Sequence, residues 1–372
     1  MIKEDIRAKE IAETFDRWEN ARIDWETAAR EDIDFYLGNH FTASERDELA
    51  SRNQSAVPMD RLYSAIEQFK AIITSKPPKF SAIAREDSDT RLSHVWKTIL
   101  EYIWDISDGD EQFKQAVHDY AVTGMGYFYA YIDKEADYGR GEVKFKHLNP
   151  FKVYVDPNSR DRYFDDASGM MVSNIMSKMQ LLDAYPKLGE PIEEGSDKLL
   201  IDEIETTSEE DWPSNQNERT MESFTPDVVK DYDYKGGSEK FRLIEYYSKV
   251  KVPYFRVLDV QANQEKILTE EEFGQLEQDE DFQKAIAKKQ IDFARVEQTR
   301  IRQTCIIGQL VLYDLILDTD IYPIVPVPNI WTNTPYPMSD VRKNKDFQRF
   351  LNKTVSLITS HAQASSGLKL LI

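Results

Sequence analysis

Two aspartates and a lysine form the pattern in this sequence that most suggests chemistry. Pro226-Asp227 is followed by Asp233-Tyr234-Lys235, an order in which carboxylates can hold Mg²⁺ and a lysine can orient the water that attacks a phosphodiester. Only five residues separate the two aspartates, which leaves little room for a strand hairpin that aims both at one metal. The surrounding stretch is rich in acids, so we expect a solvated charge run and keep a metal-dependent nuclease as the alternative.

Motifs for nucleotide, zinc and acyl-transfer chemistry are missing from the sequence. It has no GxxxxGK[ST], HExxH or GxSxG pattern, and no Cys/His cluster with metal-ligand spacing. Gly124 and Gly126 lack the third glycine of a dinucleotide loop and follow a helical pattern rather than a strand. Four acids resemble a Ca²⁺ loop loosely but do not have the EF-hand spacing, so we expect them to cap a helix instead: Asp105, Asp108, Asp110 and Glu111. We therefore expect no catalytic residue, no cofactor and no metal.

The histidines and the cysteine are scattered singly. We expect each histidine to be a surface or hydrogen-bonded residue rather than a ligand: His40, His94, His118, His147 and His361. Cys305 lies in an apolar strand pattern and is expected to be a small core residue. A single cysteine excludes an intramolecular disulfide and suits a reducing cytoplasm.

Four cations stack on one face of the last predicted helix. They are spaced three, four and four residues apart, at Arg342, Lys345, Arg349 and Lys353. The apolar side of the helix falls roughly opposite, at Phe347, Leu351, Thr354 and Ile358. This pattern favours an apolar face packed in the body and a basic face offered to DNA or another anionic partner. A solvated helix face is the alternative reading of the same cations.

The overall charge limits the possible partners of the 372-residue chain. The net charge is −20, and residues 190–233 hold 15 Asp and Glu against 3 Lys and Arg, which accounts for −12. Such an acidic protein does not coat nucleic acid unspecifically, although it could guide DNA without gripping it. No run approaches the roughly 20 apolar residues that span a bilayer, so we expect a soluble protein without a membrane partner.

The elements that position these residues are clearest between Phe113 and Pro157. A helix is expected to end near Thr123, broken by two glycines, and a strand that is aromatic on both faces should follow and lie buried or at an interface. Asn149-Pro150 interrupts the strand pattern that follows, and Asp156-Pro157 closes it. The positions expected to carry this motif are Gly124, Gly126, Asn149, Pro150, Asp156 and Pro157.

The remaining periodicities predict an α+β protein. Helical patterns cover residues 6–37, 62–73, 92–103, 269–295 and 341–360. Strand patterns cover 80–84, 170–174, a hairpin of 241–250 and 252–260 that turns near Lys251, and a hairpin of 303–317 that turns near Gly308-Gln309. We predict a body at 1–189, an acidic linker or surface excursion at 190–235, hairpins with an inserted charged helix at 236–330, and a loop and helix at 331–372.

The succession of short motifs resembles the N-terminal part of portal proteins, the head-to-tail connectors of tailed bacteriophages, particularly the short-tailed kind. The motifs are Lys76-Pro77-Pro78, residues 119–126 (DYAVTGMG), residues 149–157 (NPFKVYVDP) and residues 341–349 (VRKNKDFQR) with Asn352 and Ser356. Tyr185-Pro186 and the proline-rich strand before Trp331 also stand in the order of the family. Together the matches extend over most of residues 1–360.

The resemblance implies a fold and a function. The fold would be the α+β wing of a portal, with long amphipathic helices on antiparallel meanders and hairpins, and with its last helix leading toward the stem. The protein would be a non-enzymatic virion subunit, assembled in the host cytoplasm into a ring, usually of twelve copies, at one capsid vertex. Double-stranded DNA would pass through the ring during packaging and ejection, and the major capsid protein, terminase and tail or adaptor proteins would bind it. Family members continue into stem, clip and crown, so the chain resembles a portal that ends early.

Overall fold

The computed structural model describes residues 2–52, 54–84, 90–185, 240–259, 264–277, 282, 291–308 and 310–366. The fold is α+β, as predicted. Its helices are α1 (Ile2–Tyr36), α2 (Ala43–Ser51), α3 (Leu62–Thr74), α4 (Thr90–Ile106), α5 (Gly109–Val122), α6 (Ala136–Gly139), the 3₁₀ turn η2 (Pro150–Lys152), α7 (Lys178–Ala184), α11 (Glu270–Glu277) and α13 (Asp340–Ser366). Its strands are β1 (Met125–Asp133), β2 (Glu142–Leu148), β3 (Val153–Val155), β4 (Gly169–Ser177), β5 (Lys240–Asp259), β6 (Gln264–Thr269), β7 (Ile291–Ile307), β8 (Leu310–Leu317) and β9 (Ile324–Pro328).

Two antiparallel sheets form the body. The smaller has the order β2-β1-β9, and the larger has the order β3-β4-β5-β7-β8 with β6 added to the outer part of β5. Each sheet combines strands from before residue 185 with strands from after residue 240. The division into 1–189 and 236–330 thus follows chain order rather than the sheets, and as a division into domains it stays a prediction.

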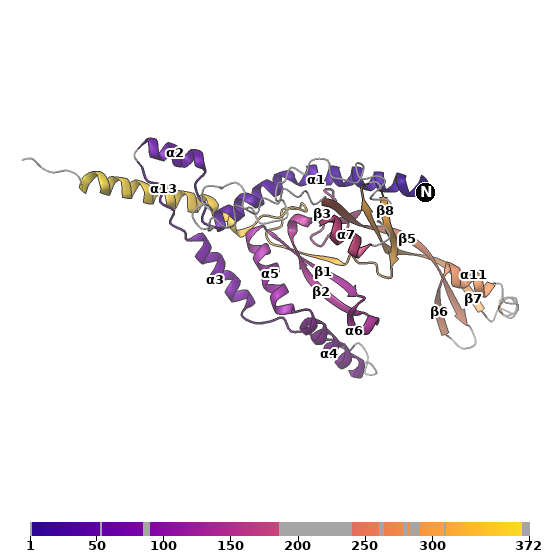
Figure 1. The fold of residues 1–372 in the computed structure, drawn as a ribbon. Helices are drawn as coiled ribbons and strands as arrows, with labels where there is room; N and C mark the ends of the chain where they lie inside the picture. The colour runs from indigo at the N-terminus through magenta and orange to yellow at the C-terminus, as the bar shows by residue number, and fades with distance from the viewer. Residues whose placement is uncertain are drawn as a thin grey trace, which may run out of the picture.

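Helix α1 runs along the larger sheet (Figure 1) and supplies much of the core. Its inward positions recur at helical spacing, and the buried apolar residues among them are Ala8, Ile11, Phe15, Trp18, Trp25, Ala29, Ile33 and Tyr36. Phe15 packs on Tyr154 of β3, with ring centroids 4.5 Å apart. Farther along, the helix meets the smaller sheet in a cluster that includes Trp25 and Tyr127. The predicted aromatic strand is β1, central in its sheet.

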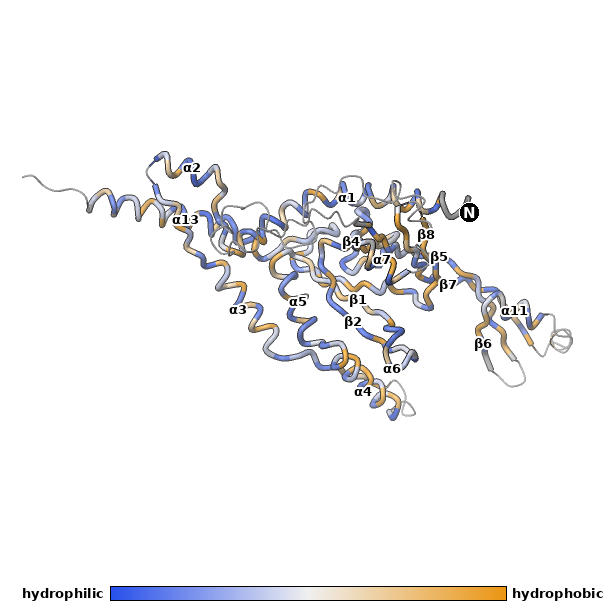
Figure 2. The backbone as a smooth tube through the Cα atoms, viewed as in Figure 1, coloured by the Kyte–Doolittle hydropathy of each residue, from blue (hydrophilic) through white to orange (hydrophobic). Residues whose placement is uncertain are grey.

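Three parts of the chain extend from this body (Figure 1). Helices α3 and α4 form an arm on one side, and α4 is apolar along much of its length although it has no buried residue (Figure 2). The ribbon of β5 and β7 carries β6 and α11 at its outer end (Figure 1). Helix α13 leaves the body on the side opposite to this ribbon (Figure 1).

Several predicted elements form and three differ. The hairpin near Lys251 is wrong, because β5 runs unbroken through that residue and pairs with β7 from Leu243 to Asp259. No glycine or asparagine interrupts the strand pattern there, so nothing reverses the chain. The helix predicted to reach residue 295 is also wrong at its end, since β7 begins at Ile291. Residues 80–84 form no strand, whereas the hairpin of β7 and β8 is confirmed.

Among the described residues, no helix has the length and apolar character needed to cross a membrane.

Candidate assembly interface at the C-terminal helix

Helix α13 rests on the body through its polar side chains. Gln348 is buried, and its Oε1 accepts hydrogen bonds from the backbone N–H groups of Arg61 and Leu62, both at 3.2 Å. Its Nε2 donates to the carbonyl oxygen of Met59 at 2.7 Å. Because Arg61 and Leu62 begin α3, Gln348 satisfies N–H groups that a helix start leaves without partners.

Two more buried residues continue this contact along α13. Asn352 Oδ1 accepts from the N–H of Met59 at 3.1 Å, and Ser356 Oγ accepts from the N–H of Val57 at 3.3 Å. The helix positions are four residues apart while the partner amides are two apart, so the segment before α3 runs antiparallel to α13. The side chains at 348, 352 and 356 therefore fix both the position of α13 and its rotation about its own axis.

The predicted basic stripe lies mostly against α1 of the same chain. Lys345 is buried and its Nζ lies 2.7 Å from a carboxylate oxygen of Glu31 and 3.5 Å from one of Asp32. Arg342 Nε donates to Asp32 at 3.0 Å, and an Arg349 nitrogen lies 2.8 Å from Glu31. These three cations are thus occupied by an acidic pair within the subunit.

Lys353, the fourth cation of the predicted stripe, is exposed. The stripe therefore does not present four cations to solvent. Contact of this face with DNA or with a partner remains a prediction, and Lys353 and the half-exposed Arg349 are the cations best placed for it.

The apolar side of α13 faces outward, which corrects our expectation that it packs in the body. Phe347 is 71% exposed, Phe350 is 68% exposed and Ile358 is 63% exposed. The reason is that the opposite face finds specific partners in the acids of α1 and the amides before α3. The helix thus buries its polar face and leaves an apolar stripe exposed to solvent.

The two members of the acidic pair have opposite pKa shifts. Desolvation raises the pKa of Asp32 in spite of Arg342, the Ser339 hydroxyl and Lys345. For Glu31, which is more exposed, burial also acts to raise the pKa, but Lys345 and Arg349 outweigh it and the pKa is lowered. Asp32 itself joins α1 to the start of α13 through Arg342 and through the hydroxyl of Ser339 at 2.8 Å.

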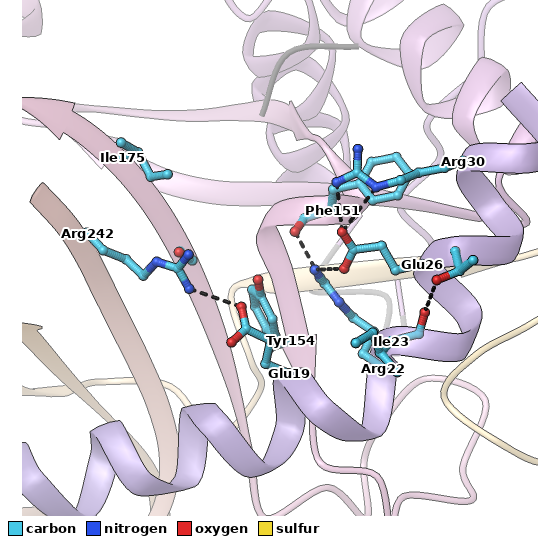
Figure 3. Close-up of a pocket in the computed structure, with 11 residues that line it drawn as sticks. Glu19, Arg22, Ile23, Glu26, Arg30, Phe151, Tyr154, Ile175 and Arg242 are labelled. Carbon is cyan, nitrogen blue, oxygen red and sulfur yellow. Dashed lines mark hydrogen bonds and ion pairs between the residues drawn. The ribbon is translucent and has the colours of Figure 1, made fainter. Parts of the chain in front are cut away.

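A buried arginine on α1 was missed by the periodicity argument (Figure 3). Arg22 donates from Nη1 to the carbonyl oxygens of Phe151 and Val153, both at 2.9 Å, and from Nη2 to Glu26 at 2.8 Å. Its guanidinium lies 3.7 Å from the ring centroid of Tyr154. In the sequence, the apolar stripe skips from Trp18 to Trp25, and Arg22 stands at the inward helical position between them.

A small cavity of about 200 Å³ opens beside Arg22, between α1 and the strands β3, β4 and β5 (Figure 3). Three arginines and two glutamates line it, namely Arg22, Arg30, Arg242, Glu19 and Glu26. These charges are paired with one another, as in Arg242 to Glu19 at 3.1 Å and Arg30 to Glu26 at 2.8 Å. The arrangement holds α1 to η2 and the larger sheet and brings no nucleophile together with a base.

The two glycines of the predicted motif allow close packing. Gly124 has a φ of +91°, and a Cβ there would lie 2.8 Å from backbone atoms of Pro337 and Met338. A Cβ on Gly126 would lie 2.6 Å from the carbonyl oxygen of Ala116. The pair therefore lets α5 turn into β1 while the loop before α13 lies directly against the turn.

The other motif positions shape the turns on either side of β3. Asn149 accepts from the N–H of Phe151 at 2.9 Å, and Pro150 begins η2. Asp156, followed by Pro157, accepts from the N–H groups of Asn158 at 2.9 Å and Ser168 at 3.2 Å. Burial acts to raise the pKa of Asp156, but the hydrogen bonds from Ser168 and Asn158 outweigh it and lower the pKa.

Two of the histidines and the cysteine make contacts within the subunit. His147 Nε2 lies 2.5 Å from Asp119, and His118 Nδ1 lies 3.0 Å from Lys70 Nζ. Cys305 is buried, and burial raises the pKa of its thiol. In the part of the chain that the structure describes, no group of three or more His, Cys, Asp or Glu is placed to hold a metal ion.

The predicted helix capping can be compared with the structure, whereas the nuclease-like residues cannot. Asp108 occupies the N-cap position of α5, but its side chain makes no capping hydrogen bond. Asp110 instead accepts from Trp104 Nε1 at 3.0 Å. The nuclease-like residues Asp227, Asp233 and Lys235 lie outside the described residues, as does the whole acidic stretch at 190–235.

Comparison with known proteins identifies the family. A family model described as "Phage P22-like portal protein" matches residues 12–369. A search of the curated proteins finds no match to the chain. The family match spans both sheets, the arm and α13, and it agrees with the resemblance inferred from the short motifs at residues 76–78, 119–126, 149–157 and 341–349. The chain therefore belongs to the family of phage P22-like portal proteins.

Proposed function

We propose that the protein is the structural subunit of a portal ring, usually of twelve copies, at one vertex of a phage capsid. The ring forms the channel through which double-stranded DNA is packaged and ejected, and terminase, the major capsid protein and tail or adaptor proteins bind to it. The family match over residues 12–369 is the observation that carries this proposal.

The form of α13 supports assembly into a ring. Its polar face is held by Gln348, Asn352 and Ser356, so its apolar face points away from the subunit. In a ring, each subunit meets its neighbours through two different surfaces, and a helix that leaves the body is available to a neighbour. Covering Phe347, Phe350 and Ile358 in this way would remove their apolar surface from water.

The charge of the chain supports passage of DNA rather than tight binding. With a net charge of −20, the subunit has no general affinity for phosphates. Three cations of the predicted stripe are paired within the subunit, which further limits the basic surface. A channel of this kind can conduct DNA without stalling it.

The position at a single vertex can be tested directly. Particles assembled with a peptide-tagged copy of the protein are labelled with gold-conjugated antibody and imaged by electron microscopy. We expect gold at one vertex per particle, and tagged major capsid protein serves as the control that labels the whole shell. Label spread over the shell, or absent from particles that hold the protein, would contradict the proposal.

A further inference from the structure

The arm leaves a second apolar surface uncovered, far from α13 (Figures 1 and 2). Along α4 the apolar residues recur at helical spacing, and the exposed ones include Leu92 at 54%, Val95 at 49% and Trp96 at 52%. Only the last turns of α4 pack on the body, where Trp104 contacts Phe145 with ring centroids 5.3 Å apart. The first three turns therefore have an amphipathic pattern without a described partner in the subunit.

The arm also has a charge unlike the rest of the chain. From the start of α3 to the end of α4, residues 62–106 carry six Lys and Arg against six Asp and Glu, so the arm is neutral in a chain of −20. Lys76, Lys79, Arg91 and Lys97 are all exposed. Phe80 packs on Trp104 with ring centroids 5.4 Å apart, which places Lys79 near the C-terminal end of α4. The apolar stripe of α4 is thus flanked by cations.

A surface of matching character lies at the outer edge of the larger sheet. Strand β8 is the last strand in the order β3-β4-β5-β7-β8, so one backbone edge has no partner among the described strands. Leu315, Ile316 and Ile321 are exposed on β8 and the loop that follows it. Two exposed aspartates lie in the loop after β8, Asp320 and Asp318, and Asp318 is 91% exposed although it pairs with Arg300.

We propose that the arm of one subunit docks on the β8 edge of the next copy of this chain, with the apolar stripe of α4 against Leu315, Ile316 and Ile321 and the arm cations against Asp318 and Asp320. Copies with a charge of −20 repel one another unless one side of the contact supplies cations. The arm and β8 lie on different parts of the molecule (Figure 1), so the contact is head to tail and repeats from copy to copy. The inference rests on the proposed ring and names two surfaces that join its subunits.

Charge reversal on each surface tests the pairing. An arm variant carries Lys76→Glu, Lys79→Glu and Arg91→Glu, and an edge variant carries Asp318→Lys and Asp320→Lys. All five positions are exposed, and a glutamate at Arg91 is favourable in the first turn of a helix, so both variants should fold. Circular dichroism and thermal melting check the fold, and Lys134→Glu on an exposed turn serves as the matched control.

Sedimentation velocity of the full chain reads out assembly. We expect the native protein and the control to assemble, each reversed variant alone to lose at least tenfold in association constant, and an equimolar mixture of the two to assemble again. Mixing restores both contacts because a reversed arm then faces a reversed edge, and a native arm faces a native edge.

The outcomes separate the inference from the proposed function. Reversed variants that assemble like the native protein, or a mixture that does not recover, would overturn the pairing of arm and β8 edge while leaving the ring proposal intact. A native chain that stays monomeric at every concentration would overturn the ring proposal and this inference with it.

Discussion

Replacement of Gln348 by leucine tests how α13 is held. Leucine has a similar volume but no polar atoms, so the change removes the two bonds from the Arg61 and Leu62 amides and the bond to the Met59 carbonyl. It also removes the donation from Nε2 to Asn352 Oδ1 at 2.8 Å. A net contribution of about 1 kcal/mol per hydrogen bond predicts a loss of about 3 to 4 kcal/mol in the free energy of unfolding.

Urea denaturation followed by tryptophan fluorescence measures this loss. Asn344→Leu is the matched control, because Asn344 is an exposed residue on the same helix and its replacement should change stability by less than about 0.5 kcal/mol. Hydrogen exchange gives a local measurement, since the amides of Arg61 and Leu62 should exchange faster in Gln348→Leu only. Equal stability of the two variants, with unchanged exchange at residues 57–62, would refute the polar attachment of α13.

Three further changes test the body. Arg22→Lys should lower the free energy of unfolding by about 2 kcal/mol, since one ammonium cannot replace the guanidinium at two carbonyls and Glu26. Arg30→Lys at the cavity rim should lower it by less than about 1 kcal/mol. Urea denaturation of both variants measures the difference. Gly126→Ala should lower the melting temperature sharply, because its Cβ would lie 2.6 Å from a backbone oxygen. Gly274→Ala in α11, where a Cβ meets nothing within 4 Å, is the control and should stabilise the protein by about 1 kcal/mol. A higher melting temperature for Gly126→Ala would contradict the close contact. The folded state lowers the pKa of Asp156, so its carboxylate stabilises the protein above the unfolded pKa of about 3.9, and this contribution is lost as pH falls through the folded pKa. Asp156→Asn should therefore be less stable than the native protein at pH 7 and equally stable in acid. A stability difference that is the same at every pH would show that the charge of Asp156 has no part in it.

Local pattern was enough to predict most of the elements. The long stripe from Ile11 to Tyr36 determined α1, and the two glycines after Thr123 determined the change from α5 to β1. These predictions succeed because apolar periodicity and glycine conformation act over a few neighbouring residues. The family resemblance was found by the order of four such short motifs rather than by any one of them.

The orientation of α13 could not be predicted from its own residues. Its two faces are visible in the sequence, but which one is buried depends on Asp32 in α1 and on the amides before α3, which are distant in the chain. An acid in a predicted core position of α1 was the available signal. The same kind of signal, a charged residue in the middle of an apolar stripe, marks Arg22.

The unbroken strand β5 illustrates a second limit. Two strand patterns that meet near Lys251 predict a hairpin, yet the ladder to β7 continues through this residue, from Leu243 to Asp259. Sheet pairing over a long distance overrides the composition of a single residue. The proline at 253 lies within this ladder, opposite Glu297.

The oligomeric state of the purified full gene product tests the central claim most directly. Native mass spectrometry, combined with negative-stain imaging, counts the copies and shows whether they close. We predict a closed ring of identical subunits with one dominant copy number. A protein that stays monomeric over the whole range of concentrations, or that forms only open chains, would contradict the assignment as a portal subunit.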